Sequence, residues 1–380
     1  MKSTTLSDAM SFIDSEILLS TEKIRNGNIY KRKKSFGVLL AAACLAFTAV
    51  SAIFISVFIG TNTPLLELKL NKEGGMGYEG EFLINPEDYE KGNPWHNCGH
   101  VCSLPVFENN SHDHKGTPCA LTENQLEITV NKVVSVLEEK ITKTKKLYAN
   151  ELYGGYEKDF VYCISAETES FLVTANAAGS VSIFLKSSEI SPYELCTKNS
   201  AEYFSDKYSE LISSVITLEK PEISISTEYN VYGETHHTYR IYDSNGRKKI
   251  DIINFNLNFA ELRFDGNGRL TVIYIYNSSD IISEIAHYPI ISESEAEKKL
   301  IAKNYISSVP YDFPGKEYIA KTDLVYKSEK GETVAPYYRF LVELPEAPVV
   351  NNMKNFGIFF VPAVKDKYIS KITLIDGEFQ

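Results

Sequence analysis

The sequence predicts an α+β fold in which an N-terminal transmembrane helix is followed by an extracytoplasmic region of antiparallel sheets packed with a few helices. Residues 36–60 form one long apolar segment, and the rest of the chain alternates period-two runs with amphipathic runs of helical period. The 24 Tyr and 20 Phe residues favour strands, because aromatic side chains pack well on a pleated sheet. Helices that cover one face of an antiparallel sheet make the α+β class.

Residues 1–35 are expected to form a cytoplasmic tail. Within it, residues 5–18 place apolar side chains on one face of a short helix, at Leu6, Met10, Ile13 and Ile17. A lone helix of this length is marginal in water, so we expect it to lie on a cytoplasmic protein partner or on the membrane. A frayed tail is the alternative.

The apolar segment runs from Phe36 to Ile59, about 36 Å of helix, which is enough to cross a hydrocarbon core of about 30 Å. The basic cluster Lys31–Lys34 directly before it predicts a cytoplasmic N-terminus. The lipid bilayer is therefore the expected partner of residues 36–60, and the cell membrane is the expected location. A cleaved signal peptide and a lipoprotein signal ending at Cys44 are the two alternatives.

The remaining chain divides into an irregular segment at 61–120, an α+β domain at 121–285 and a smaller helix-plus-sheet module at 286–380. Each of the last two begins with a helix, at about 121–146 and 292–303, and a capping box marks each start: Thr122 with Gln125, and Ser292 with Glu295. A further amphipathic helix is predicted at about 200–215.

Strands are predicted wherever short alternating runs are bounded by turn residues. They are the runs DFVYCISAE, SFLVTANA and SVSIFLK, and residues 222–229, 235–243, 249–254, 258–264, 270–277, 319–326, 336–343, 357–363 and 368–376. The sequence Asp265-Gly266-Asn267-Gly268 predicts a hairpin turn between two of these strands.

The densest group of metal-ligating residue types is His96, Cys98, His100 and Cys102. In an extended strand these four side chains share one face, and imidazole with thiolate suits zinc, but the C-x2-C spacing of a zinc knuckle is missing. A Cys98–Cys102 disulfide is the preferred alternative. It needs a turn at Gly99, because the two cysteines would lie about 13 Å apart in a strand. A segment with neither bond nor metal is the third interpretation.

No motif identifies a reaction. The sequence contains no G-x-S-x-G elbow and no H-E-x-x-H, so it nominates no catalytic and no cofactor-binding residue. His236 and His237 fall in a predicted strand, where their rings face opposite sides and cannot hold one ion together. The chain has a net charge of −11, and because the basic tail at 1–35 carries +3, the rest carries −14. This acidic main body would repel phosphates, which excludes nucleic acid as a partner.

Several segments resemble a group of single-pass membrane proteins from Firmicutes. They are LSDAMSFIDSEIL, KRKK, LLAAACLAF, GGMGYEGEF, NPW, LPVFENN, YPIISESEAEKKL, PYYRFLVELPE and FGIFFVPAV, which together span most of the chain. This resemblance implies no catalytic or binding residue. The N-terminal layout is also similar to that of anti-sigma factors, although residues 1–35 lack the His and Cys of the zinc-binding class. The helix near 292 and the strands after it resemble small PepSY-type modules.

From the sequence we therefore expect a membrane-anchored extracytoplasmic sensing or protein-interaction protein, regulatory through its short cytoplasmic tail, rather than an enzyme. The alternative is an envelope enzyme or ligand-binding protein with a site in the outer domain. A deep pocket with convergent His or carboxylate groups would favour that alternative.

Overall fold

The computed structural model describes residues 63–72, 80–97, 101–110, 121–152, 154, 159–230, 232–328 and 333–376. All of them belong to one compact unit that begins at Thr63. The described helices are η1 (Pro86–Asp88), η2 (Pro94–Asn97), α4 (Glu123–Val136), α5 (Ala149–Leu152), α6 (Lys198–Ser213), α7 (Lys248–Leu257), α8 (Glu293–Ile301), η3 (Lys316–Tyr318) and η4 (Asp366–Tyr368).

The described strands make up most of this unit. They are β1 (Leu66–Lys72), β2 (Glu81–Leu83), β3 (Ser103–Asn109), β4 (Lys143–Tyr148), β5 (Val161–Glu167), β6 (Phe171–Asn176), β7 (Ser180–Ile190), β8 (Pro221–Tyr229), β9 (Thr235–Asp243), β10 (Asn258–Phe264), β11 (Arg269–Asn277), β12 (Ile282–Pro289), β13 (Ile306–Ser307), β14 (Ile319–Ser328), β15 (Thr333–Glu343), β16 (Lys354–Pro362) and β17 (Ile369–Asp376).

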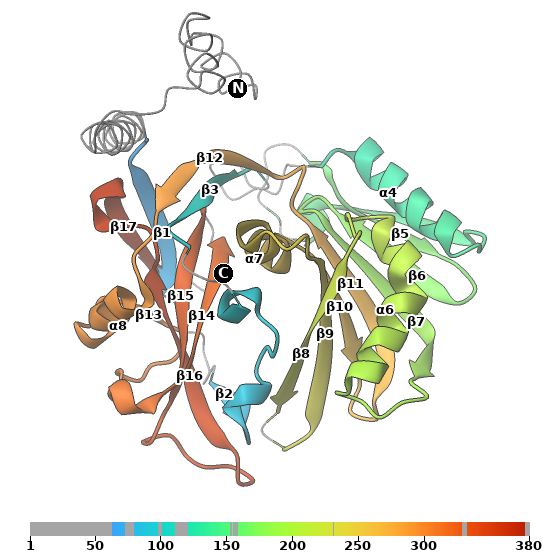
Figure 1. Cartoon of the computed structure of the whole chain (residues 1–380). Coiled ribbons are helices and arrows are strands. Elements are labelled where there is room, and N and C mark those ends of the chain that lie inside the picture. The colour runs from blue at the N-terminus through green and yellow to red at the C-terminus, as the bar shows by residue number, and fades with distance from the viewer. Residues whose placement is uncertain are drawn as a thin grey trace, which may run out of the picture. The chain divides into compact units, whose positions relative to one another are not determined.

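Hydrogen bonds join 15 strands into one sheet in the order β12-β3-β15-β16-β2-β8-β9-β10-β11-β7-β6-β5-β4, with β13 on β16 and β14 on β15. The sheet narrows at β2, where Phe82 pairs with Tyr229 of β8. We call β4–β11 the central half-sheet and β3 with β12–β16 the C-terminal half-sheet; Figure 1 shows them on either side of β2 and α7. Strands β1 and β17 form a separate parallel pair.

Helices α4 and α6 cover one face of the central half-sheet (Figure 1). Their buried residues, which include Leu126 and Val133 of α4 and Phe204 and Ile212 of α6, pack on inward-facing residues of the strands. The predicted helices at 121–146 and 200–215 are confirmed, as is the capping box of Thr122 with Gln125. Helix α4 ends early because Glu138 adopts a φ of 55°, which turns the chain into the edge strand β4.

The C-terminal half-sheet is covered on both faces. Strand β15 is buried from Val334 to Val342. Its even-numbered residues Tyr338 and Phe340 pack with residues of α7 and α8, whereas Tyr337 packs on the opposite face with the strand pair β1 and β17. The capping box of Ser292 with Glu295 at the start of α8 is confirmed.

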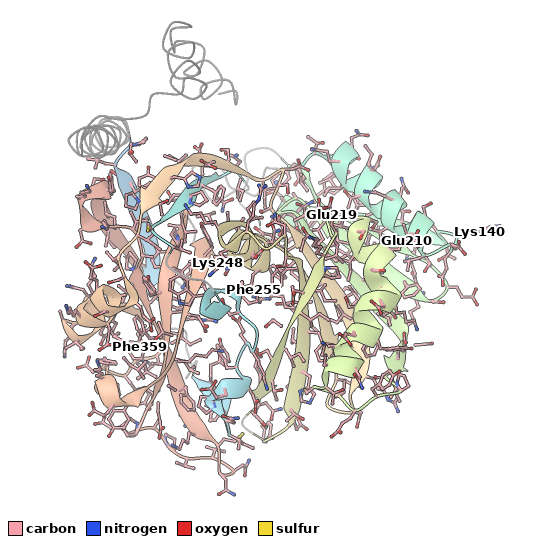
Figure 2. All side chains as sticks on the ribbon, viewed as in Figure 1. Lys140, Glu210, Glu219, Lys248, Phe255 and Phe359 are labelled. Carbon is pink, nitrogen blue, oxygen red and sulfur yellow. The ribbon has the colours of Figure 1, made fainter. Side chains whose placement is uncertain are left out.

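Helix α7 lies between the two half-sheets, where a strand at 249–254 was predicted, and that prediction is wrong. The alternation of Ile250, Ile252 and Asn254 suggested a strand, but Asp251, Ile252 and Phe255 are buried at helical spacing. Ile252 joins the core of the C-terminal half-sheet, while Phe255 packs edge-on against Tyr242 of β9 with ring centroids 5.3 Å apart. Figure 2 shows Phe255 between the half-sheets and Phe359 within the C-terminal one.

The predicted fold needs two further corrections. The segment 61–120, predicted to be irregular, supplies strands β1, β2 and β3. Among the described residues, moreover, no helix is long and apolar enough to cross a membrane. Helix α6, with 16 residues, is about 24 Å long and amphipathic, whereas a span needs about 20 mostly apolar residues.

The prediction of a single-pass membrane protein, with a transmembrane helix, a cytoplasmic N-terminus and an extracytoplasmic C-terminal region, is corrected accordingly: the described unit is mostly antiparallel sheet. Residues 5–18 and 36–60, with the partners predicted for them, lie outside the described residues.

Candidate functional site

The predicted cysteine and histidine cluster lies mostly outside the described residues. Cys98 and His100 are not among them, and of His96 only the backbone is described, in η2. Cys102 is exposed, directly before β3. The zinc site and the Cys98–Cys102 disulfide therefore both stay predictions. Within the described part of the chain, no three His, Cys, Asp or Glu side chains lie close enough together to hold a metal ion.

The adjacent histidines of β9 point to opposite faces of the central half-sheet, as predicted. His236 pairs with Glu228 in the strand register and is exposed. His237 faces the side covered by α6, where its Nδ1 lies 2.9 Å from the Sγ of Cys196. The two rings thus belong to different environments.

A polar pocket lies on the face of the central half-sheet opposite α4 and α6, and sequence reasoning did not predict it. The strand register places Ser224 and Ser226 of β8 beside Arg240 and Thr238 of β9, and Arg240 beside Glu261 of β10. Every second residue of these strands therefore contributes a polar group to one surface. The pocket has a volume of about 410 Å³, within the range of small-molecule sites.

One wall of the pocket comes from Glu90, in the loop after η1. The Lys91 backbone exchanges two hydrogen bonds with Ile225 of β8, at 2.9 and 3.0 Å, and this fixes the loop against the strand edge. Glu90 adopts a backbone φ of 43°, a value that is uncommon for residues other than glycine, asparagine and aspartate. The amine of Lys321 donates to the Tyr89 and Glu90 carbonyl oxygens from β14.

A chain of ion pairs links the two half-sheets through Glu90. Both oxygens of Glu261 are bound, one by Arg240 at 2.7 Å and the other by Arg263 at 2.6 Å. Arg240 also lies 3.7 Å from Glu90, which in turn accepts from Arg339 of β15. The order of the chain is Arg263, Glu261, Arg240, Glu90, Arg339 and Asp323, with the last pair at 3.0 Å.

Within this chain of ion pairs, the neighbouring charges keep Glu90 and Arg339 ionised. Burial alone would raise the pKa of Glu90, but Arg339 and Arg240 outweigh it and hold that pKa at about 2. Burial disfavours the Arg339 cation, yet Glu90 and Asp323 raise the pKa of this guanidinium well above its ordinary value. Arg240 is further held between the rings of Phe255 and Phe259, at 4.8 and 4.5 Å from their centroids.

Two other carboxyl groups near the pocket are compensated only in part: Arg339 lowers the pKa of Glu81 and Arg263 lowers that of Glu228, but burial outweighs both. Among the described residues neither Glu81 of β2 nor Glu228 of β8 forms an ion pair. Burial, followed by the charge of Glu228, raises the pKa of Glu81 to about 7. Glu228 is exposed as a residue, but its carboxyl faces the pocket, where desolvation and the carboxylates of Glu90 and Glu261 raise its pKa. The pocket is thus lined by the three acidic side chains of Glu90, Glu228 and Glu261 but by only two guanidinium groups, those of Arg240 and Arg263.

Comparisons with known proteins assign no role to this site. No family model and no curated protein matches the chain. One similar solved structure is the crystal structure of an uncharacterized protein from Eubacterium rectale, with 12% sequence identity over 70% of this chain and 84% of that chain. Its TM-score of 0.37 is too low to support an argument about function.

Proposed function

We propose that this protein is a non-enzymatic sensing protein that binds a small ligand bearing a positively charged amino group in the polar pocket. The observation that carries the proposal is the carboxyl group of Glu228, which forms no ion pair with a described residue. It lines the pocket with a raised pKa, beside Glu90 and Glu261, whose charges are already bound by arginines. An ammonium group is the ligand chemistry that relieves such an excess of negative charge.

The neighbouring ion pairs favour binding over catalysis. Both oxygens of Glu261 and both oxygens of Glu90 are occupied by guanidinium groups, so neither carboxylate is available as a base or nucleophile. Arg263 is different, because its side chain is 53% exposed. It can receive an anionic end of a ligand, so an amino acid or a short peptide terminus fits the lining better than a simple amine.

The position of the pocket supports a sensing role. It adjoins the loop that carries Glu90, and Glu90 bonds to Arg339 in the other half-sheet. A cation bound near Glu228 changes the charge balance at the point where the sheet is narrowest, between Phe82 and Tyr229. Binding is therefore coupled to the junction of the two half-sheets.

Calorimetry with matched probes tests the proposal. We expect γ-aminobutyrate and 1,5-diaminopentane to bind, and glutarate, which has two negative ends, to bind more weakly. Protons should be released on binding, because a cation lowers the raised pKa values of Glu228 and Glu81, so the measured heat should depend on the buffer.

The matched variants are Glu228→Gln and Glu222→Gln. Both residues lie on the same face of β8, but Glu222 is outside the pocket. We expect Glu228→Gln to weaken binding about tenfold, equivalent to about 1.4 kcal/mol, and Glu222→Gln to leave it unchanged. Equal effects of the two variants, or preferential binding of glutarate, would contradict a specific ammonium site.

A further inference from the structure

Cys196 lies at the start of α6, on the face of the central half-sheet opposite the polar pocket. Its Sγ is 2.9 Å from the Nδ1 of His237 and 3.5 Å from the hydroxyl of Thr227, and that hydroxyl is 3.1 Å from the same Nδ1. Both Cys196 and His237 are half-buried, so a small reagent can reach the pair.

The backbone around the thiol is held in an unusual conformation. Cys196 has a φ of 59°, in the left-handed region that favours glycine. Its N–H donates to the Tyr239 hydroxyl at 2.8 Å, and that hydroxyl donates to Ser200 of α6 at 3.1 Å. Thr197 then caps α6 by accepting from the Ser200 N–H. These contacts fix the thiol against the imidazole of the neighbouring strand.

From this geometry we infer that Cys196 and His237 form a nucleophile and base pair that reacts with disulfides by thiol–disulfide exchange. The pair fulfils the requirement for an activated nucleophile, since the base lies within hydrogen-bonding reach of the nucleophilic atom. This inference goes beyond the proposed ammonium binding and does not depend on it.

The protonation states suit a general-base step. Burial raises the pKa of the Cys196 thiol, and burial together with His236 lowers the pKa of His237. At neutral pH the pair is thus a thiol beside a neutral imidazole, with the proton of the ring assigned to Nε2, because the thiol and the Thr227 hydroxyl both face Nδ1. Lys91 favours the thiolate that forms during reaction, and Asp88 opposes it.

The reaction balances without a further reagent. Nδ1 of His237 accepts the thiol proton while Sγ attacks one sulfur of the disulfide R–S–S–R. The new bond joins Cys196 Sγ to that sulfur, the old S–S bond breaks, and the departing thiolate takes the proton from the imidazolium and leaves as R–SH. Cys196 is oxidised to a mixed disulfide, and the other half of the reagent is reduced.

Disulfide exchange fits this site better than acyl transfer does. Acyl transfer requires hydrogen-bond donors, usually backbone N–H groups, directed at a developing oxyanion. The N–H of Cys196 itself is bound by Tyr239, and the Ser200 N–H is bound by the Thr197 hydroxyl. Attack on a disulfide creates no oxyanion and needs no such donors.

Labelling of the reduced full chain with 2,2′-dithiodipyridine, followed by mass analysis of the peptides, tests the inference. The exposed Cys102 and the buried Cys163 serve as internal references. N-acetylcysteine, labelled in parallel, is the reference for pH dependence: its rate should rise about tenfold per pH unit between about pH 6 and 8, because only the thiolate of a simple thiol reacts. The rate at Cys196 should instead stay nearly constant there, because a neutral His237 supplies the base.

The variant His237→Gln should slow labelling of Cys196 by about a hundredfold, the low end of what a positioned general base contributes. It should also restore a tenfold rise in rate per pH unit. Thr227→Val removes a hydroxyl that contacts both Sγ and Nδ1 but keeps the base, so it should slow labelling less than His237→Gln does and should retain the flat profile.

The wild-type pH profile provides a readout that does not require any variant to fold. A Cys196 rate that rises with pH as steeply as that of N-acetylcysteine would overturn the inference, as would an unchanged rate in a folded His237→Gln protein.

Discussion

The two half-sheets are built from very different stretches of sequence. Every buried residue in the core of the central half-sheet lies between Leu126 and Ile275, in one continuous part of the chain. The main core of the C-terminal half-sheet combines residues near Val101, residues of α7 such as Ile252, and residues from Ile290 to Ala363. The first core is thus sequential, and the second depends on segments far apart in the chain.

They also differ in how their strands are covered. The central half-sheet has an apolar face under α4 and α6 and a polar face that carries the ion-pair chain, so its strands alternate apolar and polar residues. The C-terminal half-sheet buries both faces, and β15 is an almost unbroken run of buried residues. The polar pocket lies on the open face of the central half-sheet.

The strongest test of this comparison is whether the half-sheets unfold together. Phe204 in the sequential core and Phe359 in the C-terminal core are both fully buried. We expect Phe204→Ala and Phe359→Ala each to lower the free energy of unfolding by about 3–5 kcal/mol. Because the ion-pair chain and α7 join the halves, each variant should shift one shared transition in urea.

The single Trp can show whether the half-sheets unfold together or separately. Trp95 packs on Tyr338, with ring centroids 5.7 Å apart, so its fluorescence reports on the C-terminal core. Trp fluorescence and far-UV circular dichroism should give the same midpoint for Phe204→Ala. A loss of circular dichroism at a urea concentration that leaves Trp95 fluorescence unchanged would show two independently unfolding halves.

A smaller effect is expected at the junction itself. The folded pKa of Glu81 is about 7, raised from 4.5. Stability from the protonated group is therefore complete below about pH 4.5 and is lost as the pH rises through 7. Relative to Glu81→Gln, the wild type should lose about 2 kcal/mol of unfolding free energy between about pH 5 and 8.

Urea titrations at both pH values measure this loss. The exposed Glu87→Gln, in the neighbouring η1, is the matched control and should follow the wild type. Glu90 has a lowered pKa and acts in the opposite direction only below about pH 4.5, so it does not interfere in this window. If the free energies of unfolding of wild type and Glu81→Gln changed equally with pH, the prediction of a raised pKa for Glu81 would be wrong.

The smallest expected effect is the loss of unfolding free energy when one helix cap is removed in each half of the molecule. Thr122 caps α4 over the central half-sheet, and Ser292 caps α8 beside the C-terminal half-sheet, in each case with a complete capping box. Thr122→Ala and Ser292→Ala should each cost about 1 kcal/mol, measured by urea denaturation. Lys354→Ala, which removes only an exposed ion pair with Glu343, should cost less than about 0.5 kcal/mol.

The difference between the regions also explains what could be predicted from sequence. Strands β8, β9, β10 and β11 follow the predicted limits within a residue or two, and the turn at 265–268 closes the β10–β11 hairpin as expected, with the Gly268 N–H donating to the Asp265 carbonyl. Local alternation and turn chemistry decide these elements. Helix α7 was mistaken for a strand because its burial comes from both half-sheets, which no local window contains.

The candidate site shows the same limit. Polar residues occupy every second position of β8, but no local pattern places Glu90 over this face of the half-sheet or Arg339 beside Glu90. Cys196 and His237 are separated by 41 positions and meet only because α6 returns the chain to the half-sheet. Long-range pairing of single residues leaves no periodic signal in a sequence.

The parallel pairing of β1 with β17 has a consequence for synthesis on the ribosome. Leu66 pairs with Ile369, so the first described strand finds its partner only after about 300 further residues have been made. At roughly 5–20 residues per second this takes on the order of 15–60 s. During that time the apolar side of β1, with Leu66 and Leu68, has no permanent cover. The sequential core can form as it emerges, whereas this early strand waits for the C-terminal residues, so its apolar side is a place where we expect a chaperone to bind the nascent chain.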